Sequence, residues 1–332
     1  MSVALLLICA AALVAAVLTA VHHAEVVAHH VGEPFGTLVL AVSVTVIEVA
    51  LIVSLMLSGG AEAAALPRDT LYAAIMIICN GVVGVCLLVG GLSHHEQSFQ
   101  IAGTGPALAA LVALGTIVLV LPVFTTSSPG GTYTDAQLAF VALASLALWA
   151  VFVFVQTVRH RDYFLPAADA ANEAVHAPPP TRGKAAVSGA LLLVALVATV
   201  ALAKLLSPSI ESAVAAAAAP KAVVGIFIAM LVLLPETLAA VRAARANRLQ
   251  TSMNLALGSA LASIGLTVPV VVAAAVWLEL PLVLGLQPKE MAMLVMTFIV
   301  SAITLSSGRT YLMQGAVHLV VFAAFLFLAL VP

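Results

Sequence analysis

The chain has 332 residues, of which 64% are hydrophobic and only 8% are charged. A water-soluble core of this size would not need so much apolar surface, so the composition excludes a soluble protein and indicates a polytopic membrane protein. The formal net charge of −2 does not provide the excess of positive charge that a nucleic-acid partner would require.

Ten apolar runs come close to the length of about 20 residues that crosses the hydrocarbon of a bilayer. They cover residues 3–21, 35–58, 70–92, 105–124, 136–158, 186–206, 221–242, 252–278, 290–307 and 310–330. All ten are expected to be α-helices, because lipid leaves unpaired backbone groups unsatisfied. The predicted fold class is therefore an all-α polytopic membrane protein.

The second run is almost pure hydrocarbon except for Glu48 near its middle. An ionised acid at the centre of a bilayer costs about 2.5–3.5 kcal/mol on insertion scales, so it is retained where it faces protein or water and has a function. Thr45 lies three residues earlier, on the same helix face, and can add a hydroxyl oxygen. Glu48 is therefore the first candidate for an ion-binding residue.

The polar segment after the fifth run, RHRDYFLPAADAANEAVHAPPPTRGK, is typical of a linker because it is rich in proline, charged and small residues. It divides the chain into a first repeat (1–158), a cytoplasmic linker (159–185) and a second repeat (186–332). Five helices in each half force the second half to enter the membrane with the opposite orientation. Such inverted repeats are typical of secondary transporters.

The second half shows matching features. Glu236 lies in the second run of its half, as Glu48 does in the first, and Pro235 beside it removes a backbone donor and frees carbonyl oxygens. In the next run of each half, Asn254, Gly258 and Gly265 repeat the spacing of Asn80, Gly84 and Gly91. These matches support an inverted repeat.

Four segments carry a resemblance to a known family: GEPFGTLVLAVSVTVIEVALI, LLPETLAAVRAA, MNLALGSALASIGLTVPVV and SSGRTYLMQGAVHLVVFAAFL. Together they resemble the bacterial calcium/sodium–proton antiporters of the ChaA type, in the cation/Ca²⁺ exchanger superfamily. The resemblance implies two inverted five-helix repeats with the sodium/calcium exchanger-like fold, and one acid in the second helix of each repeat. These acids are Glu48 and Glu236. It also implies a secondary transporter of inorganic cations and protons, which is not an enzyme and needs no cofactor.

The residue types agree with this expectation. Ca²⁺ takes 6–8 oxygen ligands, typically from carboxylates, amides, hydroxyls, carbonyls and water. The expected cation and proton ligands are Glu48, Glu236, Asn80, Asn254, Thr45 and Ser259, with the two glutamates as the metal ligands. Two close carboxylates in a low dielectric cannot both stay ionised without a cation, so cations and protons compete for the site. Competition of this kind is an exchange mechanism.

Other readings of these residues remain open. Gly84 and Gly258 are expected to serve close helix packing, and Asn80 and Asn254 could either bind a cation or hydrogen-bond a neighbouring helix. A cation channel, or a monovalent-cation/proton antiporter that does not carry Ca²⁺, are alternative functions. The polar residues cluster at mid-depth in a few spans, which favours a transporter over a channel, and HHEQSF lacks the spacing of a zinc motif. Ion preference, stoichiometry and oligomeric state stay undetermined.

Basic residues predict which side the linker faces, since they concentrate on cytoplasmic loops. Connections after odd-numbered spans hold eight of the twelve: Arg159, Arg161, Arg182, Lys184, Arg242, Arg245, Arg248 and Arg309. The other side holds Arg68, Lys204, Lys221 and Lys289. The linker is therefore predicted to be cytoplasmic and both termini to lie outside, in the inner membrane of a bacterium.

Histidines gather on the predicted cytoplasmic side. His22, His23, His29 and His30 are expected to follow the first span, and His176 lies in the linker. Histidine has an unperturbed pKa of about 6.5, within the physiological range. We therefore expect the four histidines after the first span to be candidate pH sensors that repel cations when protonated.

Overall fold

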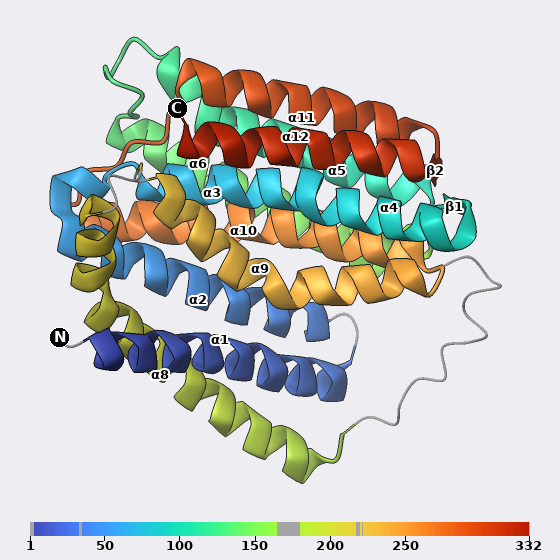
Figure 1. Ribbon diagram of the computed structural model, residues 1–332, viewed down its shortest axis with the longest axis horizontal. Coiled ribbons are helices and arrows are strands. Elements are labelled where there is room, and N and C mark those ends of the chain that lie inside the picture. Colours follow the sequence, from blue (N-terminus) through green and yellow to red (C-terminus); the bar gives the residue numbers. More distant parts are fainter. Residues whose placement is uncertain (1–2, 33–34, 165–179, 217–219, 221, 332) are drawn as a thin grey trace.

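The computed structural model describes residues 3–32, 35–164, 180–216, 220 and 222–331, and these residues form a bundle of long helices (Figure 1). The first half contains α1 (Val3–Val31), α2 (Phe35–Gly59), α3 (Leu66–Met76), α4 (Val83–His94), α5 (Ile101–Gly115) and α6 (Asp135–Phe154). A π-helical turn, Ile77–Val82, joins α3 to α4 without a break. Further π-helical turns, Thr116–Val120 and Val155–Arg159, extend α5 and α6. Short 3₁₀ turns cover Gly60–Ala63, Leu121–Val123 and Arg161–Phe164.

The second half contains α8 (Arg182–Ala216), α9 (Ala222–Arg245), α10 (Leu249–Trp277), α11 (Pro288–Ser306) and α12 (Leu312–Leu330). Two short strands, β1 (Glu96–Ser98) and β2 (Arg309–Tyr311), pair antiparallel with Glu96 opposite Tyr311. They tie the end of α4 to the start of α12, a contact that the sequence did not predict.

Ten helices in the described residues are long and apolar enough to cross a membrane, with α3 and α4 counted as one. The predicted number of spans is therefore confirmed. The predicted end of the first span at residue 21 is wrong, because α1 continues to Val31. Residues 22–31 contain no glycine or proline, and the helix stops only at Gly32, whose φ of +75° suits glycine. His22, His23, His29 and His30 therefore belong to the last turns of α1 rather than to a loop.

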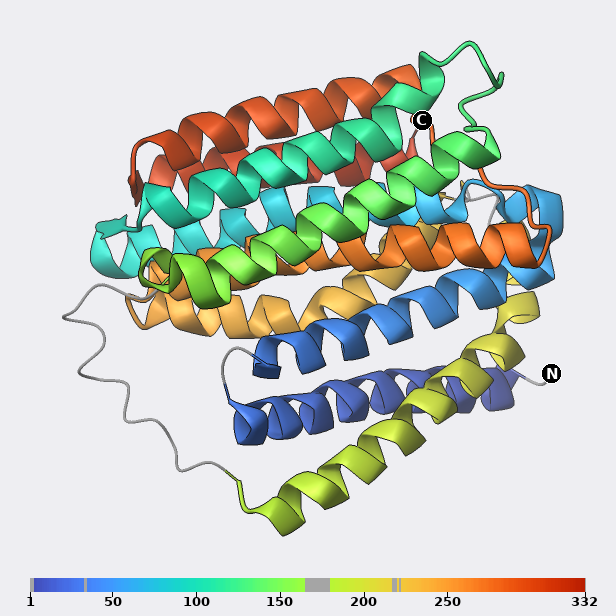
Figure 2. The same cartoon turned by 180° about the vertical axis from the view of Figure 1, so that it is seen from behind.

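The two halves run in opposite directions (Figure 1). α1 starts at the end of the bundle where α12 stops, which we call the terminus end. α8 starts at the opposite end, where α6 stops, which we call the linker end. Figure 2 shows the bundle from behind and gives the same layering. α1 and α8 lie along one side, α5, α11 and α12 lie along the other, and α2, α3, α4, α9 and α10 lie between them, with α6 crossing obliquely over α10 on the face seen in Figure 2.

Packing across the bundle follows the inverted repeat. A Cβ atom built on Gly91 of α4 would lie 2.6 Å from the backbone nitrogen of Leu312 in α12. A Cβ atom on Gly265 of α10, the matching glycine in the second half, would lie 2.5 Å from the Cβ of Trp149 in α6. In each half the third span therefore packs, at a glycine, against the fifth span of the other half. Small residues at such positions let membrane helices approach closely.

We expect the C-terminus to lie outside the cytoplasm, because the ends of α1, α4, α6, α9 and α11 share the linker end with most of the basic residues. A reporter enzyme that is active only in the periplasm should be active when fused after Pro332. The same reporter inserted within residues 165–179 should be inactive and serves as the control. Activity of the linker fusion alone would reverse the predicted orientation.

Candidate functional site

A cavity of about 320 Å³ lies among α2, α6, α9 and α10. Its lining includes six residues that were predicted from the sequence: Thr45, Glu48, Glu236, Asn254, Gly258 and Ser259. Three helices from both halves supply them, so the fold brings together residues that lie up to 214 positions apart in the chain (from 45 to 259). The wall also contains Gln156, Thr157, Arg161 and Thr251, which lie near the linker end of α6 and α10. The cavity therefore opens toward the linker end.

Glu48 is held by two hydroxyl groups of α10. It is only 2% exposed. Ser263 Oγ lies 2.8 Å from Oε1 and 2.9 Å from Oε2 of Glu48, and Thr267 Oγ1 donates to Oε2 at 3.0 Å. Hydrogen bonds from hydroxyls offset part of the cost of burying a carboxylate. This arrangement anchors α2 of the first half to α10 of the second.

The sequence reasoning missed Ser263 and Thr267, although a signal was present. Ser259, Ser263 and Thr267 follow one another at four-residue intervals in α10. Residues four apart share one face of a helix, so they form a single polar stripe. Ser259 was predicted as a further candidate ligand, and continuing along the same helix face would have found the other two.

Glu236 lines the same cavity as Glu48, and in the described part of the chain its carboxylate has fewer hydrogen-bond partners than that of Glu48. Its Oε2 is buried and has no hydrogen-bond partner among the residues that the structure describes. Pro235 lies inside α9 and interrupts its backbone hydrogen bonds next to this carboxylate. A buried oxygen without a partner is a position where a proton, a cation or water gains binding energy.

Asn254 lies at the linker end of the cavity, and its amide group is already hydrogen-bonded. Its Nδ2 donates to the Phe164 carbonyl at 2.6 Å, and its Oδ1 accepts from Gln250 Nε2 at 2.9 Å. The Thr45 hydroxyl donates to the Ala41 carbonyl at 2.9 Å within its own helix. Both oxygens keep a lone pair that can face a cation.

Asn80 lies outside this cavity, in a separate polar cluster on the π-helical turn. Its Nδ2 donates to Thr297 Oγ1 at 2.9 Å, and its Oδ1 lies 3.2 Å from His318 Nδ1. His318 Nε2 lies 3.0 Å from Thr304 Oγ1. Gly84 packs beneath this cluster, since a Cβ there would lie 3.1 Å from the Cβ of His318. The cluster joins α11 and α12 to the third span.

The candidate pH sensors also lie away from the cavity. The His22 and His23 rings meet edge to face at 5.3 Å, and His30 Nδ1 lies 2.7 Å from the Pro180 carbonyl. His29 is exposed on the last turn of α1. None of these histidines lines the cavity. Any effect of their charge on the glutamates must therefore act at a distance.

In the described part of the chain, no three His, Cys, Asp or Glu side chains gather in a group that could hold a metal ion. Glu48 and Glu236 line the cavity together with neutral hydroxyl and amide oxygens.

A family model described as sodium/calcium exchanger protein matches residues 1–158 and 187–331. The putative ionic transporter y4hA of Sinorhizobium fredii is 52% identical over 331 residues, which is 100% of this chain and 90% of that protein. The sodium-potassium/proton antiporter ChaA of Escherichia coli is 39% identical over 308 residues, which is 92% of this chain and 83% of that protein.

Solved structures share the fold at low sequence identity. Native YfkE matches with a TM-score of 0.73 at 17% identity, over 96% of this chain and 90% of that one. The H⁺/Ca²⁺ exchanger CAX matches with a TM-score of 0.72 at 14% identity, over 97% of this chain and 80% of that one. The predicted fold class, ten spans in the sodium/calcium exchanger-like arrangement, is thereby confirmed.

We expect His318→Leu to destabilise the fold. Leucine neither donates nor accepts, so Asn80 Oδ1 and the Thr304 hydroxyl each lose a buried partner. Leaving a buried polar group unsatisfied costs about 1–3 kcal/mol. The melting temperature of the detergent-purified variant should fall below that of the parent chain, whereas His29→Leu, at an exposed position, should leave it unchanged. Equal melting of all three would show that the cluster does not stabilise the fold.

Proposed function

The chain belongs to the sodium/calcium exchanger protein family, and from this premise we propose that it exchanges inorganic cations for protons at Glu48 and Glu236. The family consists of secondary transporters, so the chain is a multi-pass membrane transporter and not an enzyme. The observation that carries the proposal is the meeting of two carboxylates, one from each half, in one cavity of the membrane-spanning bundle.

Charge neutrality supplies the physical reason for exchange. A pair of ionised carboxylates inside a bilayer is strongly unfavourable unless positive charge accompanies it. One Ca²⁺ or two protons cancel the two negative charges, and so does one monovalent cation together with one proton. The protein can therefore switch the side of the membrane to which the site is open when the glutamate pair is loaded, but not when it is empty. Cations and protons then move in opposite directions through the same site.

Alternating access requires that the ion site is open to the solution on only one side of the membrane at a time. The glutamate cavity is lined toward the linker end by Gln156, Thr157 and Arg161. In the predicted orientation the linker end is cytoplasmic, so this cavity is the place where a cytoplasmic cation enters. We propose that the transporter works in a bacterial inner membrane and expels the cation from the cytoplasm.

Ca²⁺ is the proposed cation, because two carboxylates match its charge and the cavity offers hydroxyl, amide and carbonyl oxygens besides. A second candidate is exchange of Na⁺ or K⁺ for protons without Ca²⁺. It is favoured by the relative from Escherichia coli, which is 39% identical over 92% of the chain and is named for sodium, potassium and protons. The same oxygens can serve either cation.

Proton flux in everted membrane vesicles tests the activity and separates the two candidates. After respiration has acidified the vesicle interior, CaCl₂, NaCl and KCl are added in turn, and the recovery of a pH-sensitive dye is followed. We expect CaCl₂ to release protons in vesicles that contain the protein. Recovery with NaCl or KCl alone would favour the monovalent exchanger, and no recovery with any of the three salts would contradict both. Choline chloride and vesicles without the protein are the controls.

Removing either carboxylate should abolish exchange. Glu48→Gln and Glu236→Gln keep the side-chain shape but remove the charge that binds a cation or a proton. We expect dye recovery in both variants to fall to the level of vesicles without the protein, at unchanged amounts of protein in the membrane. Glu96→Gln, at the exposed strand β1, is the matched control and should retain activity. Rapid exchange by either cavity variant would rule out the two-carboxylate site.

A further inference from the structure

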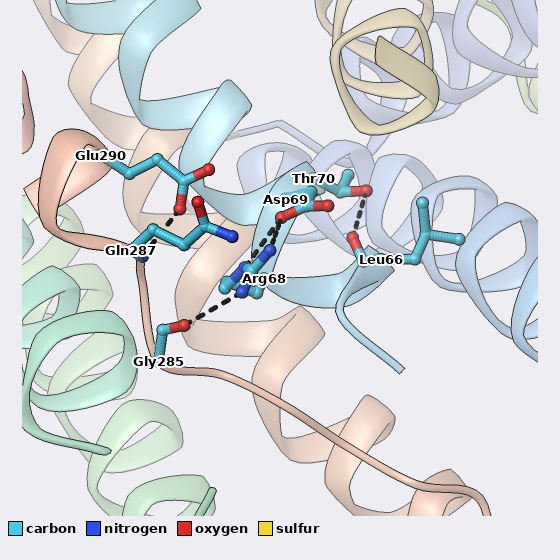
Figure 3. Close-up of polar contacts among 7 residues, drawn as sticks. All are labelled: Leu66, Arg68, Asp69, Thr70, Gly285, Gln287 and Glu290. Carbon is cyan, nitrogen blue, oxygen red and sulfur yellow. Dashed lines mark hydrogen bonds and ion pairs between the residues drawn. The ribbon is translucent and has the colours of Figure 1, made fainter. Parts of the chain in front are cut away.

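A second cavity, of about 730 Å³, lies at the terminus end of the bundle. Among the described residues, five charged side chains line it: Glu62, Arg68, Asp69, Lys289 and Glu290. They come from the 3₁₀ turn after α2, the first turn of α3 and the first turn of α11. Figure 3 shows Arg68, Asp69 and Glu290 in this region. The glutamate cavity faces the linker end, so the two cavities lie toward opposite ends of the protein.

The two cavities follow the same faces of α2 and α9. On α9 the glutamate cavity is lined by Ala229, Leu233 and Glu236, and the second cavity by Ala222 and Ile226. Steps of three and four residues keep all five on one helix face. Ile226 and Ala229 are three residues apart, which is about 4.5 Å along the helix axis. The cavities are therefore close neighbours along this helix.

On α2 the corresponding face passes from Glu48 to Leu55 and Ser58. Leu51 and Ile52 lie between them and are 4% and 0% exposed. These two side chains line neither cavity, so an apolar layer lies between Glu48 and Leu55, which are about two helical turns apart on α2. A shift of this layer would connect the glutamates to the terminus end.

Asp69 and Arg68 form an ion pair in the wall of the second cavity. They are only 6% and 9% exposed. Arg68 Nε and Nη2 both approach the same carboxylate oxygen, Asp69 Oδ1, at 2.8 Å and 2.7 Å. Arg68 thereby leaves Asp69 Oδ2 available to another positive charge. Its Nη1 donates to the Gly285 carbonyl at 3.1 Å, which fixes the guanidinium to the loop before α11 (Figure 3).

The other charges around this pair leave the wall attractive to cations. Glu290 accepts from the Gln287 backbone N–H at 3.0 Å, and Lys289 donates to the Leu328 carbonyl at 3.0 Å. Among the lining residues that the structure describes, three carboxylates against two basic groups give a formal charge of −1. A low-dielectric cleft with net negative charge concentrates cations from the adjacent solution.

Asp69 also lies beside α9. A Cβ atom on Gly225 would come within 2.8 Å of the Asp69 carbonyl carbon and 2.9 Å of the Thr70 nitrogen. The backbones of α3 and α9 are thus in contact at this level, one helical turn before the cavity-lining face of α9 reaches Ala229. Asp69 therefore lies against the part of α9 that leads from the second cavity toward the glutamate cavity.

We propose that Asp69 is a cation-binding residue of the terminus-side route: it takes up the cation between the Glu48–Glu236 site and the outer solution, with Arg68 as its counter-ion when no cation is there. This inference rests on the proposed cation–proton exchange. Asp69 sets how well cations are taken up and released at the terminus end, and the linker end is independent of it.

The first test measures exchange from each side. Everted vesicles present the linker end to the medium and right-side-out vesicles present the terminus end. We expect Asp69→Asn to raise the half-saturating CaCl₂ concentration by roughly tenfold at the terminus end, the loss of one charge-assisted contact. The value at the linker end should stay unchanged. Glu96→Gln with Arg309→Gln, which removes the exposed ion pair of β1 and β2, is the control and should change neither side. An equal change on both sides, or none at the terminus end, overturns the proposal.

A double variant distinguishes direct binding of the cation by Asp69 from an effect of the net charge of the cavity lining. It also avoids leaving Arg68 buried without its ion-pair partner. Asp69→Asn alone changes the formal charge of the lining from −1 to 0, whereas Arg68→Gln with Asp69→Asn restores −1. If Asp69 itself holds the cation, the double variant stays impaired at the terminus end. Recovery in the double variant would mean that only the net charge matters and would overturn the assignment.

A second readout does not depend on transport. The native cysteines Cys9, Cys79 and Cys86 are buried, so Ala63→Cys introduces a single accessible thiol into the second cavity. We expect CaCl₂, NaCl or KCl, but not choline chloride of equal ionic strength, to slow its labelling by a membrane-impermeant maleimide. Asp69→Asn should remove this protection. Protection without any exchange would leave Asp69 assigned while refuting the proposed function, and exchange without protection would refute Asp69.

Discussion

The placement of Glu48 is the constraint on which the rest of this structure depends. A carboxylate buried in a membrane-spanning bundle must be paired, hydrogen-bonded or protonated, because lipid supplies no partner. Ser263 and Thr267 provide hydroxyls from a helix 215 and 219 positions away. α10 must therefore lie against α2 with the correct face turned inward. The same face carries Gly258 and Ser259 into the cavity wall, so one polar interaction both joins the two halves and shapes the space between the glutamates.

Close packing at glycines makes this arrangement possible. Gly91 and Gly265 admit Leu312 and Trp149 at distances that a larger residue would prevent. Because these glycines correspond in the repeat, α12 and α6 rest on the third span of the opposite half in equivalent ways. The central spans are thereby held from both halves, and α1 and α8 lie along one side, away from the helices that pack on these glycines (Figures 1 and 2). Helix geometry is thus shared by the halves even where side-chain chemistry differs.

The sequence could predict features that stand out along a single helix. Glu48 and the Pro235–Glu236 pair are conspicuous because charge and proline are rare inside hydrocarbon, and the ten spans follow from hydropathy alone. It could not predict that Asn80 turns toward His318 and Thr297, since those partners lie 238 and 217 positions away. Arg68 and Asp69 were left outside the third span because charges normally mark its boundary. Their place inside α3 became apparent only with the Gly285 loop and α11 beside them.

The two halves differ most at the carboxylates themselves. Asn80 and Asn254 correspond with an offset of 174 positions, and the same offset relates Ser263 to Val89. The second half thus offers Ser263 toward the acid of the first, whereas the first half has Val89 at the equivalent position, although it keeps a hydroxyl, Ser93, at the position equivalent to Thr267. This divergence accords with Glu48 accepting three short contacts while Oε2 of Glu236 has no partner among the described residues. Similar helix arrangements in the two halves therefore carry an asymmetric pair, in which Glu48 accepts from two hydroxyls and Oε2 of Glu236 has no partner among the described residues.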